Sequence, residues 1–143
     1  MNRINIIALS VKDLKKSKEF YENLLGFQTP NKEENPAVIF FDNNGTKLEL
    51  CPADMLVKDI NETNPPRISD FSGITLAYNA KTKEEIDEIF AKVESLGGKI
   101  VKRPRRVFWG GYSGYFQDLD GHYWEAAFFE GWKFDENNML IIE

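Results

Sequence analysis

The chain has 143 residues, of which 42% are hydrophobic, and this is enough for one folded domain with its own core. Its formal net charge of −5 argues against nucleic acid as the main partner, because phosphate binding needs a basic surface. No stretch of 18 apolar residues is present, so no membrane span is predicted, and the single cysteine, Cys51, excludes an intrachain disulfide and favours the reducing cytoplasm.

The first half of the chain reads as a strand, a helix and further strands. Residues 4–11 are apolar on both faces, as in a buried strand. Asp13 can cap a helix that ends near Leu25, and Gly26 suits the left-handed residue that follows a helix. Two strands are then predicted, at residues 37–42 and 46–51. The residues between them, 42–45, are predicted to form a hairpin turn.

Residues 52–70 read as a linker, in which residues 54–60 could form one short helical turn. Three prolines punctuate this stretch: Pro52, Pro65 and Pro66. So long a segment without regular structure is unusual inside a domain, and it indicates a crossing between two modules.

The second half returns to the same order of elements. A strand over residues 73–79 precedes a helix that starts at the capping box from Thr82 to Glu85 and ends before Gly97. Three strands follow, at residues 99–102, 112–117 and 122–129. The basic residues around the first of these are read either as a solvated strand end or as a site for an anionic group on a small ligand: Lys99, Lys102, Arg103, Arg105 and Arg106.

One short signature occurs in both halves at matching places. Asp, Gly and Glu have the same spacing at Asp42, Gly45 and Glu49 as at Asp118, Gly121 and Glu125. An internal repeat is primary evidence of fold. We therefore predict one α+β domain over residues 1–143, made of two βαβββ modules. The first module covers residues 3–51, the linker 52–70, the second module 71–129 and a C-terminal extension 130–143.

Glu49 and Glu125 both stand in the middle of a predicted strand. A carboxylate on an inward face costs free energy unless it is paired, hydrogen-bonded or metal-bound. From strand alternation alone, both side chains could equally face solvent or an interface.

These motifs resemble the vicinal oxygen chelate superfamily, which includes glyoxalase I, bleomycin-resistance proteins and extradiol dioxygenases. The resemblance covers about residues 3–129 and is carried by residues 11–17, 20–21 and 25–27 and by the run from Trp109 to Glu125. It implies a cup-shaped mixed sheet with the helices outside, and often a homodimer. It says little about the reaction, because one fold hosts many chemistries.

The resemblance also implies a divalent metal whose ligands, often His and Glu, come from the first and last strands of each module. The matching positions here are Ile6, Glu49, Gly73 and Glu125, and neither Ile6 nor Gly73 has a ligating side chain. The single histidine, His122, lies three residues before Glu125 and should point to the opposite face. We therefore expect no complete metal site and no cofactor, although two carboxylates could hold Mg²⁺ or Mn²⁺ weakly.

A pocket without a metal would retain Glu49 and Glu125 as candidate catalytic acid and base. Residues 105–111 are predicted to form a lid over it. Six further positions are candidates for its ligand-binding wall, namely Ile6, Gly73, Trp109, Tyr112, Tyr115 and Tyr123.

Three functions stay open from the sequence. The favoured one is a metal-independent binder of a small molecule, of the bleomycin-resistance type. The second is a glyoxalase-like lyase or isomerase, with a reduced metal site or with Glu49 and Glu125 as acid and base. The third is a homodimeric interaction module with a vestigial pocket.

Overall fold

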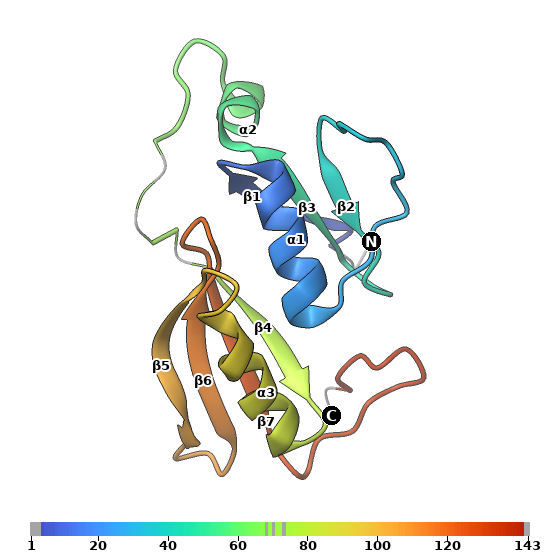
Figure 1. The fold of residues 1–143 in the computed structure, drawn as a ribbon, viewed down its shortest axis with the longest axis vertical. Helices are drawn as coiled ribbons and strands as arrows, with labels where there is room; N and C mark the ends of the chain where they lie inside the picture. The colour runs from blue at the N-terminus through green and yellow to red at the C-terminus, as the bar shows by residue number, and fades with distance from the viewer. Residues whose placement is uncertain (1–3, 68, 70, 73, 142–143) are drawn as a thin grey trace. The chain divides into compact units, whose positions relative to one another are not determined.

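The computed structural model describes residues 4–67, 69, 71–72 and 74–141. The chain forms two compact units, Met1–Ser72 and Gly73–Glu143, and each unit holds one sheet with a helix packed on it (Figure 1). Within the described residues, none of the helices combines the length and the apolarity that a membrane crossing requires.

The first unit contains a three-stranded mixed sheet in the order β1-β3-β2. β1 runs parallel to β3, and β2 is antiparallel to it. Its elements are β1 (Ile6–Val11), α1 (Leu14–Leu25), β2 (Ile39–Phe41), β3 (Lys47–Pro52) and α2 (Ala53–Ile60).

Helix α1 begins and ends where the sequence predicts. The Asp13 side chain accepts a hydrogen bond from the Lys16 amide at 3.0 Å, and Gly26 is left-handed with φ 68°. The helix buries Phe20, Tyr21 and Leu24 on one face, where Tyr21 stacks on the Phe27 ring at 5.8 Å. These aromatic contacts form the core of the first unit.

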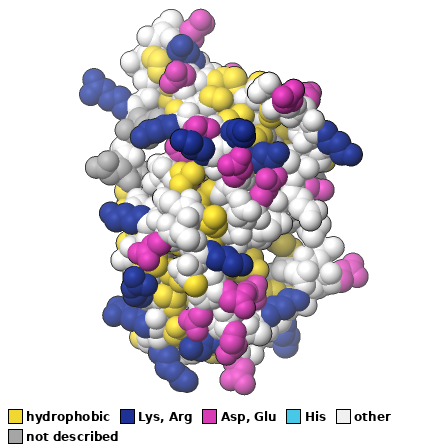
Figure 2. Space-filling view, in the orientation of Figure 1, with side chains coloured by type: hydrophobic (Ala, Val, Ile, Leu, Met, Phe, Trp, Pro, Cys, Tyr) yellow, Lys and Arg dark blue, Asp and Glu magenta, His cyan; other side chains and the backbone are white. Residues whose placement is uncertain are grey.

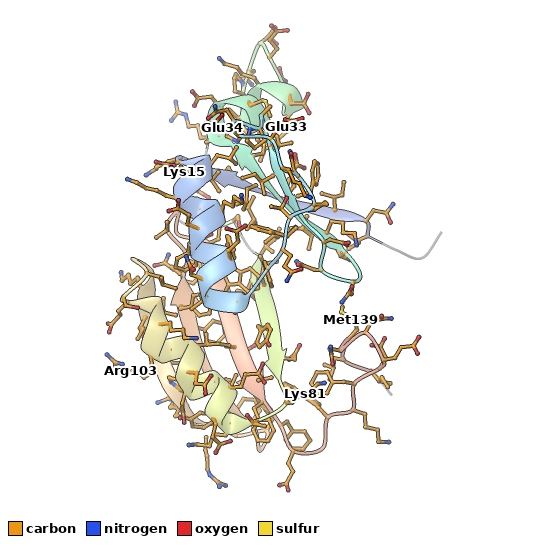
Figure 3. All side chains as sticks on the ribbon, turned by 45° about the vertical axis from the view of Figure 1, so that its right-hand side comes forward. Lys15, Glu33, Glu34, Lys81, Arg103 and Met139 are labelled. Atoms are coloured by element: carbon orange, nitrogen blue, oxygen red, sulfur yellow. The ribbon has the colours of Figure 1, made fainter. Side chains whose placement is uncertain are left out.

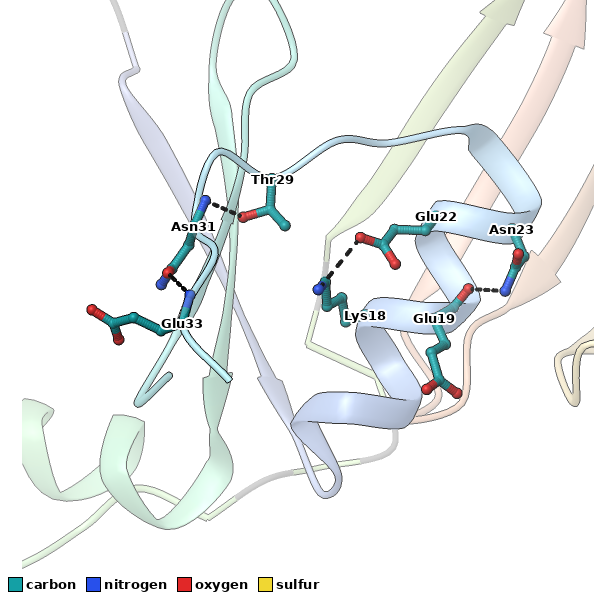
Figure 4. A network of polar contacts seen from close by, with 7 residues as sticks. All are labelled: Lys18, Glu19, Glu22, Asn23, Thr29, Asn31 and Glu33. Atoms are coloured by element: carbon teal, nitrogen blue, oxygen red, sulfur yellow. Dashed lines mark hydrogen bonds and ion pairs between the residues drawn. The ribbon is translucent and has the colours of Figure 1, made fainter. Parts of the chain in front are cut away.

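The segment that follows α1 is held by local side-chain turns (Figure 4). The Thr29 hydroxyl accepts a bond from the Asn31 amide at 3.2 Å, and the Asn31 side chain accepts one from the Glu33 amide at 2.8 Å. The segment meets the end of β2 through one backbone bond, from the Asp42 amide to the Gln28 carbonyl at 2.9 Å. It takes the place of a third strand in the first module without forming regular β-structure.

The second unit contains a four-stranded mixed sheet in the order β4-β7-β6-β5. β4 runs parallel to β7, just as β1 runs parallel to β3 in the first unit. The predicted α+β class with two βαβββ modules is therefore confirmed. The elements are β4 (Thr75–Ala80), α3 (Lys83–Val93), β5 (Lys99–Arg106), β6 (Tyr112–Gln117) and β7 (Tyr123–Phe128).

Helix α3 is capped as the sequence predicts, because the Thr82 hydroxyl accepts a bond from the Glu85 amide at 3.2 Å. The helix covers one face of the second sheet. There Phe90 meets Phe116 edge to face at 5.8 Å, and Phe116 stacks on Trp124 at 6.3 Å. The opposite face is left for the candidate site.

Two elements differ most from their predicted extents. α2 is a helix of 8 residues rather than a single turn in the linker. β5 reaches Arg106 instead of ending at Lys102, because two register irregularities let it follow β6 further. The predicted lid over residues 105–111 is therefore wrong at its start, since Arg105 and Arg106 are strand residues.

The C-terminal extension turns back on itself through a bridge between Phe134 and Leu140. The Asp135 carboxylate stabilises this turn by accepting bonds from the Asn137 and Met139 amides at 2.8 and 2.9 Å. Lys81, labelled in Figure 3, hydrogen-bonds the Asn138 side chain. On the face that Figure 2 shows, basic and acidic side chains are interspersed rather than gathered into one patch.

Candidate functional site

The free face of the second sheet carries a tyrosine directly opposite a glutamate. Tyr115 of β6 pairs with Glu125 of β7, and Glu125 pairs in turn with Ala77 of β4. Side chains that face each other across strands share one side of the sheet. α3 packs on the face that carries Phe116 and Trp124. Phe116 follows Tyr115 on β6, and Trp124 precedes Glu125 on β7. Because neighbouring residues of a strand point to opposite faces, Tyr115 and Glu125 project away from the helix.

Tyr115 and Glu125 are coupled electrostatically. Burial raises the pKa of the Tyr115 phenol, and the negative charge of Glu125 and the hydrogen bond to its carboxylate raise it further. The Tyr115 phenol is therefore neutral at neutral pH, and it lies on the same face of the sheet as the Glu125 side chain. Such a pair offers an anchored acceptor to a ligand that carries an O–H or N–H group.

A cavity of about 450 Å³ opens above this pair, within the second unit. Its size falls in the range of small-molecule sites in proteins. Its walls come from β5, from the β5–β6 loop, and from β6 and β7. The lining residues are Lys102, Arg105, Arg106, Val107, Phe108, Trp109, Ser113, Tyr115 and Glu125.

The β5–β6 loop is a tight turn that presents two aromatic residues to the cavity. Backbone bonds from Gly110 to the Val107 carbonyl at 3.0 Å, and from Val107 to the Gly111 carbonyl at 2.9 Å, close the turn. A Cβ at Gly111 would overlap the Trp109 ring, so only glycine allows that ring to lie there. This loop is the part of the predicted lid that lies outside β5.

The C-terminal extension holds Trp109 in place. Trp132 stacks on Trp109 with ring centroids 5.9 Å apart, and Phe129 meets both rings edge to face at 6.2 Å. Trp132 was not predicted as part of the site. Its aromatic character, close after the last predicted strand, was the only signal that could have indicated this role.

Tyr112 and Tyr123, both predicted to line the pocket, are not among the cavity residues. The Tyr112 hydroxyl donates to the Asp87 carboxylate of α3 at 2.7 Å, so its side chain lies on the helix face. It stands three residues from Tyr115, and the alternation of a strand places the two tyrosines on opposite faces. Tyr123 shares the face of Glu125 but lies at the far end of β7 from the loop.

Glu49 occupies the matching position of the first unit. It pairs with Ala8 of β1 and with Phe40 of β2, and its side chain is half-buried. Burial raises the pKa of the neighbouring Cys51 thiol, and the charges of Glu49 and Asp59 raise it further. Within the first unit Glu49 therefore lies beside a neutral thiol.

The pairing of the strands shows which residue of the second unit corresponds to Ile6 of the first. Ile6 pairs with Lys47, two residues before Glu49, and Thr75 pairs with Tyr123, two residues before Glu125. Thr75 rather than the predicted Gly73 is thus the equivalent position, and Gly73 itself lies outside the described residues.

These residues do not fit a transition-metal centre. Ile6 has no donor atom, and the Thr75 hydroxyl is a weak ligand beside the imidazoles that Zn²⁺ and Ni²⁺ prefer. Among the described residues, no group of three or more His, Cys, Asp or Glu side chains could hold a metal ion. Glu49 and Glu125 are the donors that the chain retains at these positions.

The model of the Glyoxalase/Bleomycin resistance protein/Dioxygenase superfamily matches residues 3–126. The chain belongs to this superfamily. A metallothiol transferase, FosB of Lysinibacillus sphaericus, is 34% identical over 122 residues, which cover 85% of this chain and 79% of that protein. The YraH protein of Bacillus subtilis is 28% identical over 116 residues, which cover 80% of this chain and 88% of YraH.

Solved structures agree with the superfamily assignment. A glyoxalase-related enzyme from Fulvimarina pelagi superposes with a TM-score of 0.87 at 25% identity, over 99% of both chains. The superfamily fold is therefore present across the chain, and the C-terminal extension is included in the match. Because this fold carries many reactions, the function has to be argued from the cavity.

Proposed function

We propose that this superfamily member binds a small organic molecule in the cavity of its second unit, and that binding needs no metal ion. The observation that carries the proposal is the roughly 450 Å³ cavity, with the Tyr115–Glu125 pair on one wall and Trp109 on another. Apolar walls with a few fixed polar groups are typical of ligand sites. An open cavity also favours this function over an interaction module with a vestigial pocket.

The test is calorimetric titration of chelator-treated protein with 2-naphthoate, a small aromatic probe. Trp109→Ala removes one wall and should weaken binding about tenfold or more, since burying an aromatic ring contributes roughly 1.5–3 kcal/mol. Met55→Ala is the matched control, because Met55 is an exposed apolar residue of α2 in the first unit. Equal binding by both variants would place the ligand elsewhere.

A second candidate is acid–base catalysis by Glu125. It is favoured by the position of this side chain on the cavity wall, directly opposite Tyr115 in the strand pairing. Glu125→Gln should then abolish turnover of methylglyoxal hemithioacetals while the protein stays folded. Unchanged turnover with Mn²⁺ or Ni²⁺ added would remove Glu125 from the mechanism.

The homodimer and the cytoplasmic setting stay predictions. Sedimentation equilibrium tests the first of them directly. A monomer at micromolar concentration would show that the cavity works within one chain.

A further inference from the structure

We infer that the ligand of this cavity carries an anionic oxygen group, such as a carboxylate or a phosphate, attached to an apolar body. This anionic class of ligand rests on the binding function proposed above. It is carried by a second observation, the way in which β5 presents its basic residues to the cavity.

A bulge in β5 brings two cations to one face. Lys102 pairs with Tyr115 and Arg105 pairs with Ser113, so three steps along β5 match two steps along β6. In a regular strand, residues three apart point to opposite faces, whereas the extra residue restores the same face to both. Lys102 and Arg105 therefore both lie on the side of Tyr115 and Ser113, and both line the cavity.

Close backbone packing holds this bulge in place. A Cβ at Gly114 would lie 2.7 Å from the Lys102 carbonyl oxygen and 2.9 Å from the Pro104 nitrogen. Glycine at this position of β6 thus lets the two backbones approach closely. The backbones of β5 and β6 therefore place the basic residues on the cavity face, whatever conformations their long side chains adopt.

The charges of the cavity do not cancel. Lys102 and Arg105 lie on the cavity face, Arg106 joins the lining from the next position of β5, and Glu125 is the single acidic residue of the lining. Within the described part of the chain, Arg105 and Arg106 have no ion pair. This local excess of positive charge stands out in a chain whose net charge is −5, and it favours an anion in the cavity.

Arg and Lys suit an oxyanion in complementary ways. A guanidinium donates two parallel hydrogen bonds to a carboxylate or phosphate, and an ammonium acts as a point charge. The apolar part of the ligand would then lie against Phe108 and Trp109, the aromatic residues of the loop. Phe108 is fully exposed, so its ring is accessible for this contact.

The neighbouring Arg103 offers a matched control. Its guanidinium pairs with Glu94 at 3.7 Å and lies outside the cavity lining. In Figure 3 it projects outward from the second unit. Arg103→Gln and Arg105→Gln therefore remove the same charge from the same strand, but only the second removes it from the cavity.

The experiment titrates the full chain with three probes of one shape, in about 0.15 M salt, where distant surface charges are screened. The probes are 2-naphthoate, neutral 2-naphthamide and cationic 2-naphthylmethylamine. We expect 2-naphthoate to bind at least about tenfold more tightly than 2-naphthamide. Arg105→Gln should remove most of that preference, and Arg103→Gln should leave it intact.

The outcomes separate the anionic class from the proposed function. Tighter binding of the amide or the amine, with loss of affinity in Trp109→Ala, would keep the cavity as a binding site and overturn the anionic class. Equal losses in Arg103→Gln and Arg105→Gln would overturn the anionic class as well, because the preference would come from net charge. Absence of binding by all three probes would overturn both.

Discussion

Tyr115 and Glu125 stand opposite each other on β6 and β7, and the negative charge of Glu125 helps to raise the pKa of the Tyr115 phenol. The pair joins the repeat signature of the sequence to the cavity of the structure. It turns a glutamate in mid-strand, which would be costly if unpartnered, into a fixed polar feature of the cavity wall.

The first prediction concerns the titration of this pair. Glu125→Gln should move the Tyr115 titration to lower pH, because it removes the negative charge that opposes the phenolate. Absorbance at the phenolate band, compared with that of Tyr115→Phe, isolates this one tyrosine. Glu94→Gln, at a carboxylate paired with Arg103, should leave the titration unchanged.

The raised pKa of Tyr115 also makes the free energy of unfolding depend on pH. The folded chain holds the Tyr115 proton more tightly than the unfolded chain does, so the resulting stabilisation is complete below the ordinary tyrosine pKa near 10. It is lost as the pH rises from there through the folded pKa. Urea unfolding of the wild type and of Tyr115→Phe across this window should therefore converge at high pH, and a widening gap would contradict the pairing.

The second prediction concerns the C-terminal extension. Trp132→Ala should lower the free energy of unfolding by about 1 kcal/mol or more and weaken binding of 2-naphthoate, because the Trp109 ring loses its stacking partner. Denaturant melts and calorimetry measure the two effects. Phe134→Ala disturbs the same extension outside the aromatic cluster and should spare the affinity. A loss of affinity in Phe134→Ala as large as in Trp132→Ala would contradict a specific role for the stack.

The third prediction concerns the β5 bulge. Gly114→Ala should destabilise the protein by about 1–3 kcal/mol, because the added methyl group meets the Phe90 ring at 2.6 Å as well as the β5 backbone. Since it pushes against the bulge, the folded variant should also lose its preference for 2-naphthoate over 2-naphthamide. An unchanged unfolding curve would show that the strands can separate without cost.

The fourth prediction concerns Cys51. This thiol is only 3% exposed, and burial together with the nearby charges of Glu49 and Asp59 raises its pKa. Reaction of the native protein with an aromatic disulfide reagent at neutral pH should thus be far slower than that of the denatured chain. Equal rates would mean that the second half of β3 opens readily.

Local signals in the sequence were enough to predict much of the fold. Asp13 and Gly26 mark the ends of α1 through their own backbone preferences, and the spacing that Glu49 and Glu125 share fixes the repeat. These features depend on a few neighbouring residues, so one sequence suffices to read them.

The site was harder to predict because it depends on pairing between strands. The bulge that aligns Lys102 with Arg105 appears only once β5 is set against β6, and no local pattern announces it. The stack of Trp132 on Trp109 likewise joins a residue before β6 to a residue after β7 in the sequence. By contrast, the alternation of a strand is enough to separate Tyr112 from Tyr115, and the bond from Tyr112 to Asp87 agrees with that separation.

The most direct test of the central claim is calorimetric titration of 2-naphthoate into wild-type protein after exhaustive chelation, repeated with added Mn²⁺ or Zn²⁺. A cavity formed by Trp109, Arg105 and the Tyr115–Glu125 pair predicts one binding site per chain, with the same affinity under all conditions. Binding that appears only when a metal ion is restored would contradict it.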